Sequence, residues 1–588
     1  MSGFERKTGT VDADGLPGRA DAGPAGHFRF AADFGLGVLM LLAVGAVTLV
    51  PVVFVVIESF NTAGIAEPYK FGLAGWQQAF SSPKTLSAIG YSFLLSIRIP
   101  IALAIAFVIA WLLIRVRIPG SRLIEHILWF SFFLPLLPVA IGWILLLDSG
   151  YGLLNLVLEK LPFIHGPVFS IYSVPGIIWV HLSLATVPVM VILLAPALRQ
   201  LDAANEEAAV MSGAGNLLTL FRVTIPLIAP AILTAFIAGF IRSLEVFEVE
   251  QLLGTPAGIQ VYATRIYDLI SSEPPLYPQA MALSSFFLLI LLVMTLLHQR
   301  QLGRLGGRAT ITGKGVRLRP ALRAKWHYLA TALLGLYIAF SIGLPLVMLL
   351  LGSFNRLFGF FFIADPWTLD HWIEAGSDPD IAHAALNSTV IGLAAALIGT
   401  LLYALIAWAL VRTRLWGRGV ISLLIWLPWA IPGVVLGLTL STILLEAPVL
   451  SALYGTSVPL VLALIVKSMP IGVQMLRTSI GQVSQDIEEA AAMSGAGFPL
   501  IFRRITLPLI APMCVAIFLL VFMATLTDIS TVVLLASPGS RTLSLLMFQF
   551  STSSRPESAA VVGIIIATLS LFITSIAFRI GITMNPEH

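Results

Sequence analysis

The amino-acid sequence predicts an all-α, polytopic membrane protein with about twelve transmembrane helices, arranged as two tandem six-helix bundles. The composition excludes a soluble domain: 58% of the 588 residues are hydrophobic, only 11% are charged, and the mean hydropathy is +0.95. Soluble domains carry about 25% charged residues. A second observation is the recurrence of long apolar stretches, and a third is a polar stretch that occurs twice, about 280 residues apart.

A membrane-spanning helix needs about 20 mainly apolar residues. Such stretches lie near residues 34–58, 90–114, 123–147, 174–197, 225–247 and 279–298 in the first half, and near 328–352, 386–411, 420–445, 457–476, 508–534 and 559–580 in the second. The single cysteine, Cys514, lies inside one of them, which excludes a disulfide framework and a cysteine-based metal site.

These stretches divide the chain into four parts. Residues 1–30 are rich in Gly, Ala, Asp and Arg without apolar periodicity, which predicts a disordered cytoplasmic tail. Residues 31–299 form a first domain of six spans and residues 327–583 a second. Residues 300–326 are a basic linker between the two domains. Parallel repeats of six spans each begin and end on the same side of the membrane.

The arginines and lysines orient the chain, because cytoplasmic loops carry an excess of them. Arginines occur in the loop after the second span of each half and throughout the linker: Arg115, Arg117 and Arg122, then Arg412, Arg414 and Arg418, with Lys314 in the linker. All of these lie on one side if the N- and C-termini are both cytoplasmic. The sequence therefore predicts a multi-pass membrane protein whose N- and C-termini are both cytoplasmic.

The repeated stretch reads EEAAVMSGAGNLLTLFRVTIPLIAP from Glu206 and EEAAAMSGAGFPLIFRRITLPLIAP from Glu488. In each copy a possible cap, Asp202 or Ser484, precedes a short Ala- and Glu-rich helix. Glycine then allows a turn, and proline opens the next span, where the first helical turn tolerates it. Both loops, 200–225 and 482–507, are expected on the cytoplasmic face as compact helix–turn–helix units.

These two loops resemble the EAA signature of the membrane subunits of bacterial ABC importers. The matching residues are Glu206, Glu207, Ala208, Ala209, Gly213 and Pro226 in the first copy, and Glu488, Glu489, Ala490, Ala491, Gly495 and Pro508 in the second. The resemblance implies type I importer permease bundles in which each loop docks on an ATP-binding subunit. It also implies as partners two copies of a cytoplasmic ATPase and an extracytoplasmic solute-binding protein.

The sequence contains no loop of the form Gly-x-x-x-x-Gly-Lys-Ser/Thr that would cradle a nucleotide. The segment from Gly307 to Gly315 has the wrong spacing and lacks the hydroxyl residue. We therefore expect a transport subunit that is not an enzyme, binds no cofactor or metal directly and no nucleic acid, and depends on ATP hydrolysis by a separate subunit.

Ionisable residues inside spans are costly and usually face a cavity or a partner. Candidates for the translocation path are Arg242, Glu245 and Glu248, in a group with Glu250 at the outer part of the fifth span, and Asp528 at the corresponding depth of the eleventh. Glu245 and Glu248 are three residues apart, which predicts one helical face. Pairing with Arg242 and lining of the path both remain open interpretations.

Within the importer family, PWAIPGVVLG from Pro428 and TDISTVVLLASPGSRTLSL from Thr527 look most like the ferric-iron branch of a group that also includes thiamine and phosphonate permeases. Ferric iron is the substrate that this resemblance implies, with thiamine, 2-aminoethylphosphonate or another small solute as alternatives. Two readings from other classes are an ion-coupled secondary transporter and a membrane-embedded enzyme. The first is disfavoured by the duplicated loops, and the second lacks convergent polar groups at one depth.

The charge distribution predicts that Lys314 is cytoplasmic. In a Cys514→Ala background, a cysteine introduced at position 314 should react with an impermeant maleimide only after the cells are opened. Labelling of intact cells at this position would reverse the orientation, and with it the side on which both repeated loops lie.

Overall fold

The computed structural model describes residues 24–63, 68–116, 118–184, 186–201, 203–306, 324–413 and 415–579. Within these ranges the chain is helical and contains no β-strand, only two isolated bridges, Asn61–Phe71 and Asn355–Trp367. Each bridge closes a short hairpin after the first span of its half. The predicted all-α class is confirmed.

The spans of the first half are built from helices whose ends are often marked by proline or glycine. In chain order they are α1 (Pro24–Glu58), α3 (Pro83–Leu95) with α4 (Arg98–Arg115), α5 (Ser121–Phe133) with α6 (Leu136–Leu147), α8 (Val174–Ser183) with α9 (Thr186–Gln200), α12 (Ile225–Glu245) and α14 (Tyr277–Gly306). Shorter elements outside these spans are α2 (Ala74–Ser81), α7 (Leu153–Leu158), the π-helix η2 (Glu250–Gly254), η3 (Thr255–Ala257) and α13 (Tyr262–Ser271).

The second half repeats this order. Its spans are α15 (Ala324–Ile338) continued by η4 (Ala339–Gly343) and α16 (Leu344–Phe354), then α18 (Pro379–Arg412), α19 (Arg418–Trp426) with η5 (Leu427–Ala430) and α20 (Gly433–Glu446), α21 (Val458–Gln482), α24 (Leu507–Thr527) and α26 (Pro556–Arg579). Shorter elements are α17 (Asp370–Ser377), η6 (Ser451–Leu453), η8 (Pro538–Ser540) and α25 (Leu543–Thr552). The six remaining elements belong to the two repeated loops.

Twelve spans result only if three bent helix pairs each count as one. Among the described residues, nine helices are long and apolar enough to cross a membrane by themselves. The third span of each half is sharply broken, by 101° between α5 and α6 and by 103° between α19 and α20. Proline explains both breaks, because Pro135 and Pro432 lie at the bends with extended backbone (ψ 144° and 145°) and cannot continue a helix.

Several predicted boundaries shift. Helix α1 begins at Pro24, so the expected tail is shorter than residues 1–30, and residues 1–23 lie outside the described part of the chain. The expected linker 300–326 overlaps α14, which extends to Gly306, and residues 307–323, including Lys314, also lie outside it. The fifth and eleventh spans end at Glu245 and Thr527, earlier than the predicted 247 and 534.

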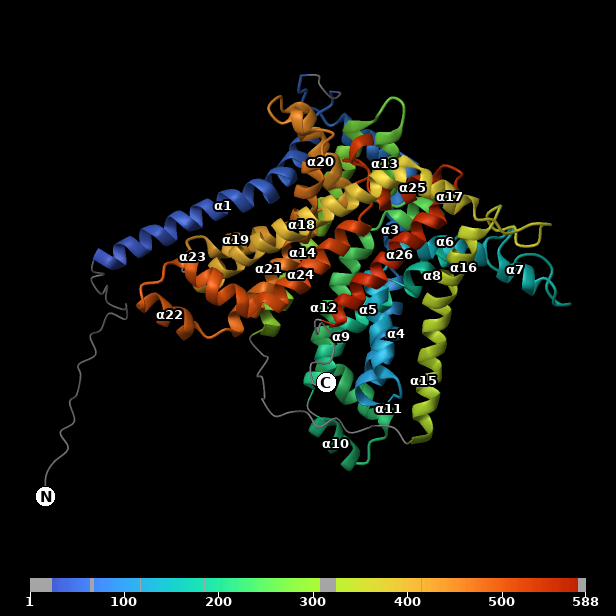
Figure 1. Cartoon of the computed structure of the whole chain (residues 1–588), viewed down its shortest axis with the longest axis horizontal. Coiled ribbons are helices and arrows are strands. Elements are labelled where there is room, and N and C mark those ends of the chain that lie inside the picture. The colour runs from blue at the N-terminus through green and yellow to red at the C-terminus, as the bar shows by residue number, and fades with distance from the viewer. Residues whose placement is uncertain are drawn as a thin grey trace.

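The first span of each half packs against the broken span of the other half. Helix α1 lies along α19 and α20, and α16 lies along α6 (Figure 1). Both contacts include a close backbone approach at glycine. A Cβ on Gly37 would lie 2.7 Å from the carbonyl oxygen of Trp416, and one on Gly142 would lie 2.0 Å from that of Pro345. Small residues allow such approach between helices in lipid, so the two halves form one interlocked body.

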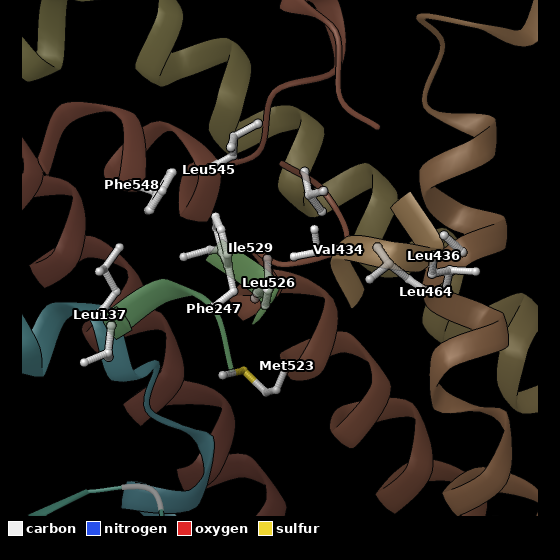
Figure 2. Close-up of a cluster of buried hydrophobic side chains, with 14 of the residues drawn as sticks. Leu137, Phe247, Val434, Leu436, Leu464, Met523, Leu526, Ile529, Leu545 and Phe548 are labelled. Atoms are coloured by element: carbon white, nitrogen blue, oxygen red, sulfur yellow. The ribbon is translucent and has the colours of Figure 1, made fainter. Parts of the chain in front are cut away.

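A continuous apolar cluster fills the centre between the halves. Figure 2 shows Phe247 of the first half beside Leu526 and Ile529 of the second, with Leu545 and Phe548 of α25 above them. Phe247 and Ile529 are 0% and 1% exposed. The two residues occupy equivalent positions of the repeat, because they are as far apart along the chain as Glu206 and Glu488. The Phe247 and Phe548 rings are 5.5 Å apart between centroids. Equivalent positions of the repeat thus meet at the middle of the molecule.

Candidate functional site

The repeated loops fold as predicted, each starting with a short helix. These are α10 (Ala203–Met211) and α22 (Gln485–Met493). The Ser484 hydroxyl caps α22 by accepting a hydrogen bond of 3.3 Å from the Asp486 amide. The corresponding cap of α10, Asp202, lies outside the described residues. Both helices end at a turn with glycine in the left-handed region, Gly213 at φ +86° and Gly495 at φ +84°.

After the turn, each loop enters the next span through the same sequence of helical forms. In the first copy, α11 (Asn216–Thr219) leads into the π-helix η1 (Leu220–Thr224), and Pro226 lies in the first turn of α12. In the second, α23 (Phe498–Ile501) leads into the π-helix η7 (Phe502–Thr506), and Pro508 lies in the first turn of α24. π-Helical turns are rare and frequently occur at functional sites. The expected second short helix is therefore continuous with the span that follows it.

Both loops lie on one side of the molecule. Figure 1 shows α10 at the bottom of the view and α22 at the lower left, whereas α13, α20 and α25 lie at the upper end. The outer surface of each loop is small and apolar. Ala208 and Ala490 are exposed, and the methionine at the C-terminal end of each short helix, Met211 or Met493, is 88% or 89% exposed. Exposed apolar side chains of this kind indicate a protein contact surface.

The first glutamate of each pair faces inward. Glu206 Oε2 lies 3.1 Å from Arg115 Nε, and the Thr224 hydroxyl donates a hydrogen bond of 2.8 Å to Glu206 Oε1. The second loop repeats the arrangement. Glu488 Oε2 lies 3.0 Å from Arg412 Nε, and the Thr506 hydroxyl donates to Glu488 Oε1 at 2.7 Å.

The second glutamate of each pair faces outward. The side chains of Glu207 and Glu489 are exposed, and Glu489 Oε1 accepts a hydrogen bond of 2.8 Å from Gln485 Nε2 within α22. Ala209 and Ala491 are half-buried against the protein. Of the two adjacent glutamates in each loop, only Glu207 or Glu489 therefore presents its negative charge at the surface.

At the other end of the fifth span, Arg242 is paired with Glu245, which is one of the two interpretations that the sequence left open. Arg242 NH1 lies 3.0 Å from Glu245 Oε2. The expectation that Glu245 and Glu248 share a helical face is wrong, because α12 ends at Glu245 and Val246 is extended (ψ 140°). Glu248 is half-buried in the segment after the helix, and the described residues give its carboxylate no side-chain hydrogen bond.

Asp528 is bound by a lysine that the sequence analysis missed. It lies directly after α24, and its carboxylate forms an ion pair with the Lys467 ammonium of α21. Lys467 also donates hydrogen bonds of 3.1 Å to the hydroxyls of Ser530 and Thr531. Glu245 and Glu248 lie within electrostatic range of both Lys467 and Asp528. Asp528 is thus paired with Lys467, Glu245 is paired with Arg242, and Glu248 lies near both Lys467 and Asp528.

Glu250 belongs to a separate buried cluster in the first half. Its Oε1 lies 3.2 Å from Arg98 NH1 and 3.0 Å from His181 Nε2, and all three side chains are at most 2% exposed. Arg98 NH2 also donates to the Ser243 carbonyl at 2.9 Å. This cluster connects α4, α8 and the start of η2. It holds the segment after the fifth span in place, as Lys467 does after the eleventh.

The sequence offered a signal for the three missed residues. Arg98, His181 and Lys467 are isolated polar residues within predicted spans, and such residues mark internal pairing or a pathway. Their partners could not be identified, since Arg98 and Glu250 are 152 positions apart and no local sequence pattern relates residues at that separation. Among the described residues, no group of three or more His, Cys, Asp or Glu side chains could hold a metal ion.

Comparison with known proteins gives a consistent result. Residues 399–581 match the family model described as binding-protein-dependent transport system inner membrane component. The chain is 31% identical over 204 residues to a putative ABC transporter permease protein, ORF1, of Streptomyces antibioticus, covering 34% of this chain and 87% of that protein.

Two further relatives are named for iron. The ferric transport system permease protein FbpB of Actinobacillus pleuropneumoniae is 25% identical over 367 residues, covering 61% of this chain and 51% of the relative. The chain thus spans about half the length of that protein. The Fe(3+)-transport system permease protein FbpB 2 of Haemophilus influenzae is 23% identical over 543 residues, covering 90% and 96%.

The left-handed turn predicts a specific sensitivity at Gly495. Replacing it with valine should weaken association with the ATPase subunit that the EAA resemblance implies by about tenfold, because a left-handed conformation costs a β-branched residue about 1–2 kcal/mol. Co-purification of the two proteins would measure this. Gly497→Val is the matched control, since Gly497 is not left-handed and its Cβ would meet only Pro499 at 3.8 Å. Equal association of the two variants would contradict the prediction.

Proposed function

Because this chain belongs to the family of binding-protein-dependent transport system inner membrane components, the permeases of ABC transporters, we propose that it imports ferric iron. An extracytoplasmic binding protein would deliver the iron, and the two bundles would move it across the inner membrane by alternating access. Two copies of a cytoplasmic ATPase would dock on α10 and α22 and supply the energy.

A single observation carries this proposal. Two loops of the same fold, with the same exposed alanine, glutamate and methionine, project from one side of a twofold-repeated helix bundle (Figure 1). A pair of identical motor subunits requires such a pair of surfaces. An ion-coupled transporter or a membrane-embedded enzyme has no use for them.

Ferric iron is the substrate that the names of two relatives support. Carboxylate oxygens are ligands that hard cations prefer, and Glu248 is the candidate path residue whose carboxylate has neither an ion pair nor a side-chain hydrogen bond among the described residues. A second candidate is an oxyanion such as 2-aminoethylphosphonate. Lys467, with the Ser530 and Thr531 hydroxyls beside it, favours that alternative because an ammonium and two hydroxyls can bind a phosphonate group.

Uptake into proteoliposomes tests the function. The permease would be reconstituted with its cognate ATPase and binding protein, and radioactive ferric iron would be presented on the binding-protein side. We expect uptake that requires ATP and is unaffected when a protonophore collapses the proton gradient. Uptake driven by an ion gradient without ATP would identify a secondary transporter instead. If iron does not accumulate and excess 2-aminoethylphosphonate or thiamine inhibits the transporter, the inhibiting solute would be assigned as the substrate in place of iron.

The candidate path residues predict two different mutant phenotypes. Glu248→Gln should lower uptake by about tenfold while leaving folded yield and ATPase association unchanged, because Glu248 has no ionic partner to lose. Asp528→Asn should lower folded yield as well, since it leaves the Lys467 ammonium unpaired in the membrane.

A double variant, Lys467→Met with Asp528→Asn, separates folding from transport. It removes both charges, so folded yield should recover. Glu245→Gln is the matched control for Glu248→Gln, because Glu245 is already neutralised by Arg242. Normal uptake by a well-expressed Glu248→Gln variant would remove Glu248 from the path.

A further inference from the structure

We infer that the triads Arg115–Glu206–Thr224 and Arg412–Glu488–Thr506 are struts that transmit motion from the docking helices to the transmembrane spans. The inference rests on the proposed function, because it assigns a role within ATP-driven transport. It concerns the glutamates that face inward, and so differs from recognition of the ATPase by the exposed Glu207 and Glu489.

Each strut joins three elements through one carboxylate. In the first half, one oxygen of Glu206 on α10 contacts Arg115 at the end of α4, and the other accepts the Thr224 hydrogen bond at the end of η1. In the second half, Glu488 on α22 joins the end of α18 to the end of η7 in the same way. With both oxygens occupied, the carboxylate cannot rotate or shift without breaking a contact.

The arginines extend the connection to a fourth element. Arg115 NH2 donates to the Leu201 carbonyl, directly after α9, at 3.3 Å. Arg412 NH2 donates to the Ile480 and Val483 carbonyls at the end of α21, at 3.1 and 2.7 Å. Each docking helix is therefore linked to the cytoplasmic ends of the second, fourth and fifth spans of its own half.

Burial makes these connections stiff. The Arg115 and Arg412 side chains are 2% and 8% exposed, and those of Glu206 and Glu488 are 19% and 9% exposed. An exposed ion pair contributes little and is screened by salt, whereas breaking a buried pair leaves an unpaired charge in a poorly solvated site. A displacement of the docking helix is therefore transmitted to the spans more readily than it breaks the ion pair of the strut.

The surroundings of the two struts have diverged while their geometry has not. Phe221 in the first loop corresponds to Arg503 in the second, and Asn205 corresponds to Ile487. The ion-pair distances nevertheless differ by only 0.1 Å, at 3.1 and 3.0 Å. Both threonines are the last residue of a π-helix, whose extra residue per turn sets where the hydroxyl points. Two independent copies of one arrangement favour a shared mechanical role.

The test compares coupling with assembly in the full transporter complex. Glu488→Gln keeps the shape of the side chain and removes its charge. We expect the ATPase to co-purify within about twofold of wild type, and ATP hydrolysis to continue. Uptake per ATP hydrolysed should fall by at least about tenfold. Glu489→Gln removes the neighbouring exposed charge, and should instead reduce co-purification without lowering the ratio of uptake to hydrolysis.

Thr506→Val provides a variant that folds even if Glu488→Gln does not. It removes one hydrogen bond, keeps the ion pair, and should lower uptake per ATP by a smaller factor of about threefold. The reversed pair, Arg412→Glu with Glu488→Arg, should recover part of the coupling that either single change loses.

Two results would overturn the strut. One is a wild-type ratio of uptake to hydrolysis in Glu488→Gln and Thr506→Val. The other is a loss of uptake in proportion to the loss of folded protein, which is what a purely structural role predicts. Failure of the proposed function is recognised separately, because wild-type complexes would then show no ATP-dependent uptake at all.

Discussion

The pairing of buried charges from distant parts of the chain is the constraint on which this structure depends. A charged side chain in the middle of a bilayer costs about 2.5–3.5 kcal/mol on insertion scales. Each buried charge therefore needs an oppositely charged partner that offsets this cost. Arg98 with Glu250, Lys467 with Asp528, and the arginines of the two struts all meet that requirement. Since each partner comes from a different helix, the pairs also determine which helix ends stay together.

The pairs fall into two groups, one that is the same in both halves and one that differs between them. At the docking side, the two halves carry the same strut with the same geometry. At the opposite ends of the fifth and eleventh spans, the first half uses Arg98 and His181 around Glu250, whereas the second uses Lys467 around Asp528. Identical motor subunits require identical docking, but a single substrate imposes no such symmetry on the path. A fused chain can therefore diverge where two copies of one subunit could not.

The sequence was sufficient for the fold class, the repeat and the left-handed turns at Gly213 and Gly495, because these follow from hydropathy and local backbone rules. It could not distinguish straight spans from the bends at Pro135 and Pro432, since proline is tolerated in transmembrane helices and its effect depends on neighbouring helices. Helical periodicity also failed at Glu248, where the helix had already ended. The inward direction of Glu206 and Glu488 depends on arginines 91 and 76 positions earlier, a contact that no local pattern encodes.

The two spans that begin at the struts end at the apolar centre of the molecule. Phe247 and Ile529 lie just beyond the ends of α12 and α24, the two spans that begin at the struts, and they meet in a dry cluster between the halves (Figure 2). A hydrated ion cannot cross such a cluster. Movement of α12 and α24 at the ends that carry the struts would be carried along each helix to these residues. The same two spans thus connect the repeated loops to the apolar centre of the molecule.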